Sequence, residues 1–171
     1  MKIVLTRCVL RSWRPGDEDS LVRSANSRKV WRNLRDGFPH PYTSADARRW
    51  LAAAVRQSPE RAVAIAVDSE AVGGIGVELQ KDVWRHSAEI GFWLGEAYWG
   101  RGITTEAAAA FTDFSFRAFD LRRIFARVFE WNPASARVLE KCGFTLEGRL
   151  RKSVLKDGRL VDELIYGKLR E

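Results

Sequence analysis

The chain has 171 residues, of which 46% are hydrophobic and 30% are charged, so we expect one globular domain spanning residues 1–171. It contains no run of about 18 apolar residues and no apolar signal-peptide core, so neither a membrane span nor a secretory leader is expected, and a cytoplasmic protein is predicted. The two cysteines, Cys8 and Cys142, do not make a disulfide framework and are expected to be reduced. The net charge of +7 would suit a polyanionic ligand or a nucleic acid, but the charges are dispersed along the chain, which favours an ordinary solvated surface.

The first part of the chain predicts a strand followed by helices. Residues 3–13 alternate as a strand does, and Asp17 is the expected N-cap of a weakly periodic helix. Residues 38–43 form a rigid connector, because each proline restricts the residue before it to extended geometry. Thr43 or Ser44 is then expected to cap a strongly amphipathic helix.

The middle of the chain predicts strands. Residues 61–67 and 71–79 have the pattern of a hairpin, and Gly73 and Gly74 within its second strand indicate a bulge or a close approach of another backbone. Residues 88–94 alternate as a further strand.

A loop that carries Gly95, Gly100 and Gly102 follows residues 88–94 and leads into an amphipathic helix predicted over residues 104–119. A strand, a glycine-containing loop and a helix N-terminus in succession make an anion cradle. Unpaired backbone N–H groups and the positive end of the helix dipole point the same way, and glycine lets a phosphate approach the backbone.

The C-terminal part predicts a strand, a helix and a hairpin. Residues 122–129 alternate as a strand, and Asn132 is expected to cap a helix that ends before Gly143. Residues 148–155 and 160–169 then form the expected final hairpin.

Two phosphate-binding motifs do not fit the glycine loop. The nucleoside-triphosphate loop needs a Gly-Lys-Ser/Thr ending that no stretch supplies. The dinucleotide fingerprint needs G-x-G-x-x-G, whereas Gly100, Gly102 and Thr105 give G-x-G-x-x-T.

A third motif resembles this loop. The stretch Trp99–Thr104 is similar to the pyrophosphate loop, Q/R-x-x-G-x-G/A, of the GNAT superfamily of acyl-coenzyme A dependent N-acetyltransferases, with Trp99 replacing Gln/Arg and Thr104 replacing Gly/Ala. The sequence Y-W-G-R-G-I-T-T-E-A at Tyr98–Ala107 resembles the corresponding stretch of the RimJ/RimL-like branch, which contains ribosomal-protein N-terminal acetyltransferases. The side chain of Thr104 either crowds the pyrophosphate or donates a hydrogen bond to it.

A second stretch supports the same resemblance. The string N-x-x-S-x-x-V-L-E-K-x-G-F at Asn132–Phe144 is similar to the second GNAT signature, and the resemblance spans nearly the whole chain. It implies an α/β (α+β) GNAT fold, with a mixed, mostly antiparallel sheet of about seven strands, splayed in the middle and flanked by about four helices. It also implies acetyl-CoA as cosubstrate. No histidines and cysteines lie at a metal-ligand spacing, so no metal is expected.

Glu89 and Ser135 are the candidate catalytic residues. The attacking amine must be neutral, and the resemblance places Glu89 where several GNAT enzymes carry a general base. The alternative is an ion pair with Arg85 or Arg127. Many family members use a tyrosine as the proton donor to the leaving thiolate, but this chain has Leu139 at that position. The resemblance to the RimJ/RimL-like branch implies that Ser135 is the proton donor instead. The alternative for Ser135 is a hydrogen bond to a helix carbonyl.

The resemblance also implies binding residues. Backbone amides around Phe92–Leu94 are expected to stabilise the oxyanion, and Asn132 is expected to hold the pantetheine or only to cap its helix. The expected cofactor-binding residues are Phe92, Trp93, Leu94, Gly100, Arg101, Gly102, Ile103, Thr104, Thr105 and Asn132. The candidate substrate-binding residues, for which core packing is the alternative, are Trp31, Phe38, His40 and Tyr42.

Three functional hypotheses follow. The first is acetyl transfer to the α-amine of a peptide or protein, and the second is transfer to a small amine such as a polyamine, an amino acid or an aminoglycoside. The third is a non-catalytic acyl-CoA sensor. A nucleic-acid partner is disfavoured because no basic strip interleaved with aromatics occurs. The sequence leaves the oligomeric state open, a homodimer included.

Overall fold

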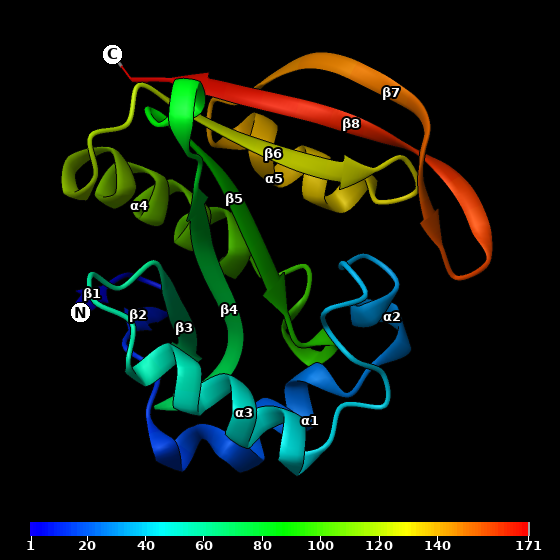
Figure 1. Ribbon diagram of the computed structural model, residues 1–171. Helices are drawn as coiled ribbons and strands as arrows, with labels where there is room; N and C mark the ends of the chain where they lie inside the picture. The colour runs from blue at the N-terminus through cyan, green and yellow to red at the C-terminus, as the bar shows by residue number, and fades with distance from the viewer. Residues whose placement is uncertain (171) are drawn as a thin grey trace. The chain divides into compact units, whose positions relative to one another are not determined.

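A computed structural model describes residues 1–170 and shows an α/β fold with one sheet. Eight strands hydrogen-bond in the order β1-β2-β3-β4-β5-β6-β8-β7, one more than the sequence predicted, and Figure 1 shows them with their helices. The residue contacts gather into two units. The first contains Met1–Gly76 and Phe92–Ala107, and the second contains Val77–Gly91 and the chain from Ala108 onward. Three elements run through both units: β4 (Glu70–Leu79), β5 (Ser87–Leu94) and α4 (Ile103–Ala118).

In the first unit, the predicted strand over residues 3–13 is wrong, because the chain turns back on itself. β1 (Lys2–Val4) and β2 (Val9–Arg11) pair antiparallel, and the Leu5 N–H donates to the carbonyl of Cys8 within the turn. β2 then pairs with β3 (Ala62–Val67), which pairs with β4.

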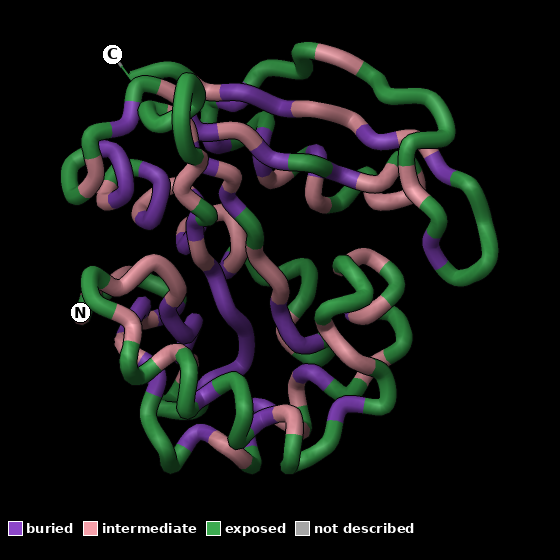
Figure 2. The backbone as a smooth tube through the Cα atoms, in the orientation of Figure 1, coloured by how far each residue is buried: buried purple, intermediate pink, exposed green. Residues whose placement is uncertain are grey.

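Helices α1 (Glu18–Ala25) and α3 (Ser44–Val55) pack against each other in the first unit, whereas α2 (Arg28–Trp31) is a single short turn. Figure 2 shows buried residues recurring along one side of each longer helix, as their amphipathic patterns predict. The buried core of this unit contains Trp13, Leu21, Ala25, Tyr42, Ala47, Leu51, Ala64 and Ala71.

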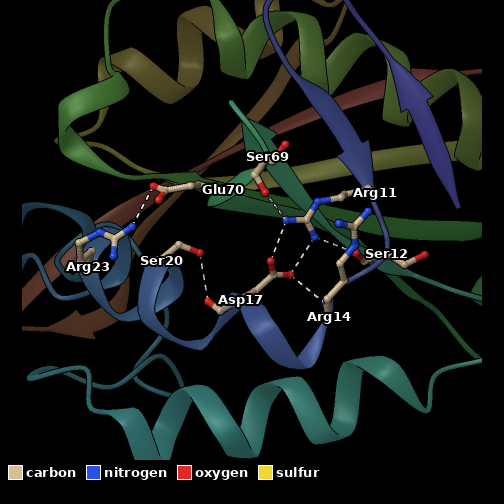
Figure 3. Close-up of polar contacts among 8 residues, drawn as sticks. All are labelled: Arg11, Ser12, Arg14, Asp17, Ser20, Arg23, Ser69 and Glu70. Atoms are coloured by element: carbon tan, nitrogen blue, oxygen red, sulfur yellow. Dashed lines mark hydrogen bonds and ion pairs between the residues drawn. The ribbon is translucent and has the colours of Figure 1, made fainter.

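Asp17 begins α1, as predicted, but its carboxylate does not cap that helix. Both carboxylate oxygens accept hydrogen bonds from the Arg11 guanidinium, at 2.7 and 2.8 Å, and one also accepts from the backbone N–H of Arg14 at 2.9 Å (Figure 3). Arg11 donates in addition to the carbonyl of Ser69, in the turn between β3 and β4. This buried pair therefore ties the end of β2, the start of α1 and the β3–β4 turn together.

The N-terminus of α3 follows the sequence prediction. Thr43 is the N-cap, and its hydroxyl accepts from the Asp46 N–H at 3.3 Å while the Asp46 carboxylate accepts from the Thr43 N–H at 2.9 Å. The Thr43 hydroxyl and amide lower the pKa of Asp46, because their hydrogen bonds favour the carboxylate. This reciprocal arrangement is a capping box.

Gly73 and Gly74 allow another strand to approach closely, as expected. A Cβ atom at Gly73 would lie 2.4 Å from the backbone oxygen of Trp93, and one at Gly74 would lie 2.8 Å from the Trp93 indole nitrogen. The register of β3 with β4 also shifts beside Gly73, between Ile65 and Ala66. A side chain at Gly73 would collide with the backbone of β5, and one at Gly74 would displace the Trp93 ring. Gly73 therefore fixes how closely the end of β5 lies against β4.

In the second unit, β5 and β6 (Arg123–Phe129) run parallel, with registers Ser87↔Arg123, Ala88↔Ile124 and Glu89↔Phe125. The last paired residue of β5 is Glu89, although β5 itself ends at Leu94 and β6 at Phe129. β6 pairs with β8 (Arg159–Leu169), which forms a hairpin with β7 (Thr145–Lys156), and the short helix η2 (Asp82–Trp84) precedes β5.

α5 (Pro133–Lys141) packs against β6 in the second unit (Figure 1). Gly143 ends it with a φ of +81°, which confirms the predicted stop. Among residues 1–170, no helix is long and apolar enough to cross a membrane.

Candidate functional site

The glycine loop forms as the sequence predicts. β5 ends at Leu94, a short helical turn, η3 (Glu96–Tyr98), follows, and α4 begins at Ile103. Gly100 and Gly102 have φ angles of +73° and +74°, a conformation that residues with a Cβ atom rarely adopt. Because α4 begins directly after Gly102, the first amides of the helix have no acceptor within the helix itself.

Two hydrogen bonds hold the start of this loop to the strands. The indole N–H of Trp99 donates to the carbonyl of Leu94 at 2.7 Å, and the N–H of Gly95 donates to the carbonyl of Val72 at 2.8 Å. Trp99, which replaces the Gln/Arg of the resembled motif, thus closes the loop onto the end of β5. Its bulk and its single N–H donor are the sequence signal for that role.

The loop fits an anionic diphosphate. A Cβ atom added at Gly100 would meet no atom within 4 Å, whereas one at Gly102 would lie 3.3 Å from the side chain of Arg7. Open backbone, a nearby cation and the positive end of a 16-residue helix occur together here, which is what a diphosphate group requires.

The other predicted cofactor residues of this loop differ in their exposure. Ile103 is buried, so only its backbone is available, and Thr104 and Thr105 are half-buried in the first turn of α4. Arg101 is exposed, and its guanidinium lies over the Tyr98 ring with 5.5 Å between the guanidinium carbon and the ring centroid. Leu94 is buried, and Phe92 and Trp93 are half-buried.

In the second unit, Glu89 lies on β5 where the register with β6 ends. Its carboxylate is 3.6 Å from the Arg127 guanidinium, and the side chain is only 13% exposed. Arg127 is also 3.5 Å from Glu163, which is buried and accepts a 3.1 Å hydrogen bond from Ser153. The ion pair with Arg127, one of the two alternatives predicted for Glu89, is therefore present.

Asn132 and Ser135 contact each other at the start of α5. The Asn132 side-chain oxygen accepts from the Ser135 N–H at 3.3 Å, and the Asn132 amide donates to the Ser135 hydroxyl at 2.9 Å. The predicted N-cap is thus confirmed. The hydroxyl of Ser135 keeps its own proton to donate, because the bond from Asn132 uses only an acceptor position.

The four candidate substrate residues lie in the first unit and divide into two pairs. Trp31 and His40 stack with 5.8 Å between ring centroids, and His40 is exposed. The ring centroid of Phe38 lies 5.0 Å from that of Tyr42 and 5.4 Å from that of Trp93. Tyr42 is buried in the core, where burial raises its pKa to about 12, so its surroundings match the alternative of core packing.

Both cysteines are buried, and they are not joined by a disulfide. Burial raises the pKa of the Cys8 thiol to about 11, with a smaller contribution from Glu106, and burial also raises the pKa of the Cys142 thiol. Both thiols are thus protonated near neutral pH and are poor nucleophiles. Within residues 1–170, no group of three or more His, Cys, Asp or Glu residues could hold a metal ion.

The family model for the acetyltransferase (GNAT) domain matches residues 7–145, well over half of the chain. The chain belongs to the GNAT acetyltransferase family. The resemblance inferred from the glycine loop and the Asn132–Phe144 signature is confirmed, including the likeness to the RimJ/RimL branch. The protein is an acetyl-CoA dependent N-acetyltransferase.

The matches to curated relatives cover either most of this acetyltransferase or about half of it. The SPbeta prophage-derived uncharacterized N-acetyltransferase YokL of Bacillus subtilis is 28% identical over 164 residues, 95% of this chain and 89% of the relative. The ribosomal-protein-serine acetyltransferase of Escherichia coli is 32% identical over 83 residues, 48% of this chain and 46% of the relative. The spermidine N(1)-acetyltransferase of Vibrio cholerae is 24% identical over 158 residues, 92% of this chain and 90% of the relative.

Solved structures share the fold of this acetyltransferase. RimJ of Mycobacterium smegmatis, solved in complex with CoA-disulfide, is 26% identical, with a TM-score of 0.84. The match covers 99% of this chain and 87% of that one.

Proposed function

We propose that this acetyltransferase transfers the acetyl group of acetyl-CoA to the N-terminal α-amine of a peptide or protein. The observation that carries this choice is the charge of the segment that includes α2. Residues 27–36 hold four cationic side chains and one acidic side chain: Arg28, Lys29, Arg32, Arg35 and Asp36. Lys29 forms an ion pair with Glu96, but the segment still carries a net positive charge. This charge disfavours a polycationic amine and favours a peptide with acidic residues near its amino end.

Relatives support both candidate acceptors to different degrees. The Escherichia coli relative is named for a ribosomal-protein serine, which favours a protein N-terminus, whereas the Vibrio cholerae relative is named for spermidine. Transfer to a small amine is therefore the second candidate. Trp31, Phe38 and His40 are proposed to contact the acceptor, because two of these rings are half-buried and the third is exposed.

The proposed roles of the chain's own groups follow the requirements of acyl transfer. Acetyl-CoA supplies a thioester, and the amine attacks the carbonyl carbon of that thioester. Glu89 accepts the proton of the amine, directly or through water, and the backbone amides of Phe92–Leu94 donate to the thioester oxygen. Ser135 gives a proton to the leaving thiolate, and Asn132 orients Ser135 through the bond between their side chains.

A panel assay tests the acceptor. We expect thiol release from acetyl-CoA with a peptide that has a free α-amine and acidic residues at its second and third positions. We expect none with the same peptide blocked at its amino end, and mass spectrometry should locate the acetyl group on the α-amine. A lysine-rich peptide of equal length is the matched control and should react more slowly.

Other outcomes of this panel would exclude the proposal. Faster turnover with spermidine or an aminoglycoside than with any peptide would assign a small-amine acceptor. CoA binding without turnover on every acceptor would indicate an acyl-CoA sensor.

A further inference from the structure

The turn between β1 and β2 is fastened to the first turn of α4. The Glu106 carboxylate accepts a hydrogen bond from the Thr6 N–H at 3.1 Å and another from the Arg7 N–H at 2.8 Å. These residues are 100 and 99 positions apart in the sequence, and all of them belong to the first unit. By accepting from the backbone N–H of Arg7, Glu106 fixes the position from which the Arg7 side chain extends.

The guanidinium of Arg7 lies against the backbone of Gly102. A Cβ atom added at Gly102 would be 3.3 Å from Nε and 3.9 Å from Cζ of Arg7. The side chain of Arg7 is 55% exposed, and its guanidinium lies 3.7 Å from the Glu106 carboxylate. That distance exceeds a hydrogen bond, so the guanidinium retains N–H donors for a further acceptor.

We propose that Arg7 binds the diphosphate of acetyl-CoA at the N-terminus of α4, an inference that rests on the cofactor role proposed for the glycine loop. The positive end of the helix, the amides after Gly102 and the guanidinium then act on the same anion. Glu106 contributes the opposing negative charge there, and Arg7 together with two backbone N–H groups offsets it.

Arg7 is better placed for this role than Arg101, the arginine within the loop. Both arginines are exposed, but the Arg101 guanidinium lies over the Tyr98 ring, whereas Arg7 lies directly beside Gly102. We therefore expect Arg101→Gln to affect cofactor affinity less than Arg7→Gln.

Calorimetric titration of the full-length protein with CoA and with dephospho-CoA tests this assignment. Arg7→Gln should weaken both ligands by about tenfold, the size expected for one charge-assisted hydrogen bond. Arg7→Lys should recover part of the affinity, because it keeps the charge but not the planar fork. The matched control is Arg48→Gln, which removes another exposed arginine paired with a glutamate in the same unit and should change affinity less than about twofold.

Each variant is also followed by its CoA-induced rise in Tm, measured against its own ligand-free Tm, so that a loss of stability is separated from a loss of binding. Unchanged affinity in Arg7→Gln would overturn the proposal and leave Arg7 a role in the fold alone. A loss confined to CoA, with dephospho-CoA unaffected, would assign Arg7 to the 3′-phosphate and also overturn it. Failure of the wild type to bind CoA would instead contradict the cofactor role of the loop.

Discussion

Replacing Glu89 with glutamine is expected to lower kcat/KM for acetyl transfer by about 100-fold or more while changing the affinity for CoA less than about twofold. The amide has the shape of the carboxylate but does not accept a proton from the amine near neutral pH. Arg127 keeps its second carboxylate partner, Glu163, at 3.5 Å, so the fold around position 89 should persist.

Activity and stability together separate a base from a structural carboxylate. If Glu89 accepts the proton, Glu89→Gln loses turnover while its free energy of unfolding in urea stays close to that of the wild type. If the carboxylate only pairs with Arg127, the variant should lose stability and keep most of its activity. Glu70→Gln is the control, since that side chain is 53% exposed and lies in an ion pair with Arg23, and its activity should be unchanged.

Asp17→Ala is expected to destabilise the protein by about 3–5 kcal/mol, because it leaves the Arg11 guanidinium buried without its counter-charge. Both side chains are almost fully buried, with 5% of Arg11 and 6% of Asp17 exposed. The change also removes the acceptor of the Arg14 N–H. Urea unfolding followed by circular dichroism measures the loss.

The exposed pair between Arg23 and Glu70 provides the comparison, since Figure 3 shows it in the same region. Glu70→Ala should cost no more than about 1 kcal/mol, because water screens that pair. Equal losses for Asp17→Ala and Glu70→Ala would show that the buried pair does not stabilise the fold as described.

Features fixed by neighbours in the sequence were predictable. Thr43 and Asn132 cap their helices through groups three residues away, and such contacts depend on local geometry alone. Gly100 and Gly102 adopt positive φ angles, which glycine permits at little cost. The glycine loop and the two helix caps were therefore predictable from the sequence.

Features fixed by distant contacts were not predictable from the sequence. Residues 3–13 alternate without a break, so their periodicity could not reveal the turn between β1 and β2. Asp17 has the position of an N-cap, yet its carboxylate accepts hydrogen bonds from the buried guanidinium of Arg11 instead of capping the helix. The placement of Arg7 depends on Glu106, which lies 99 residues away.

We propose that the loop after β5 holds the diphosphate of acetyl-CoA at the N-terminus of α4. A crystal structure of the complex with CoA is its most direct test. Phosphate oxygens are predicted to lie about 2.7–3.2 Å from backbone nitrogens between Gly100 and Thr105. A diphosphate bound elsewhere, or loop amides already bonded to acceptors of the chain itself, would contradict this role of the loop.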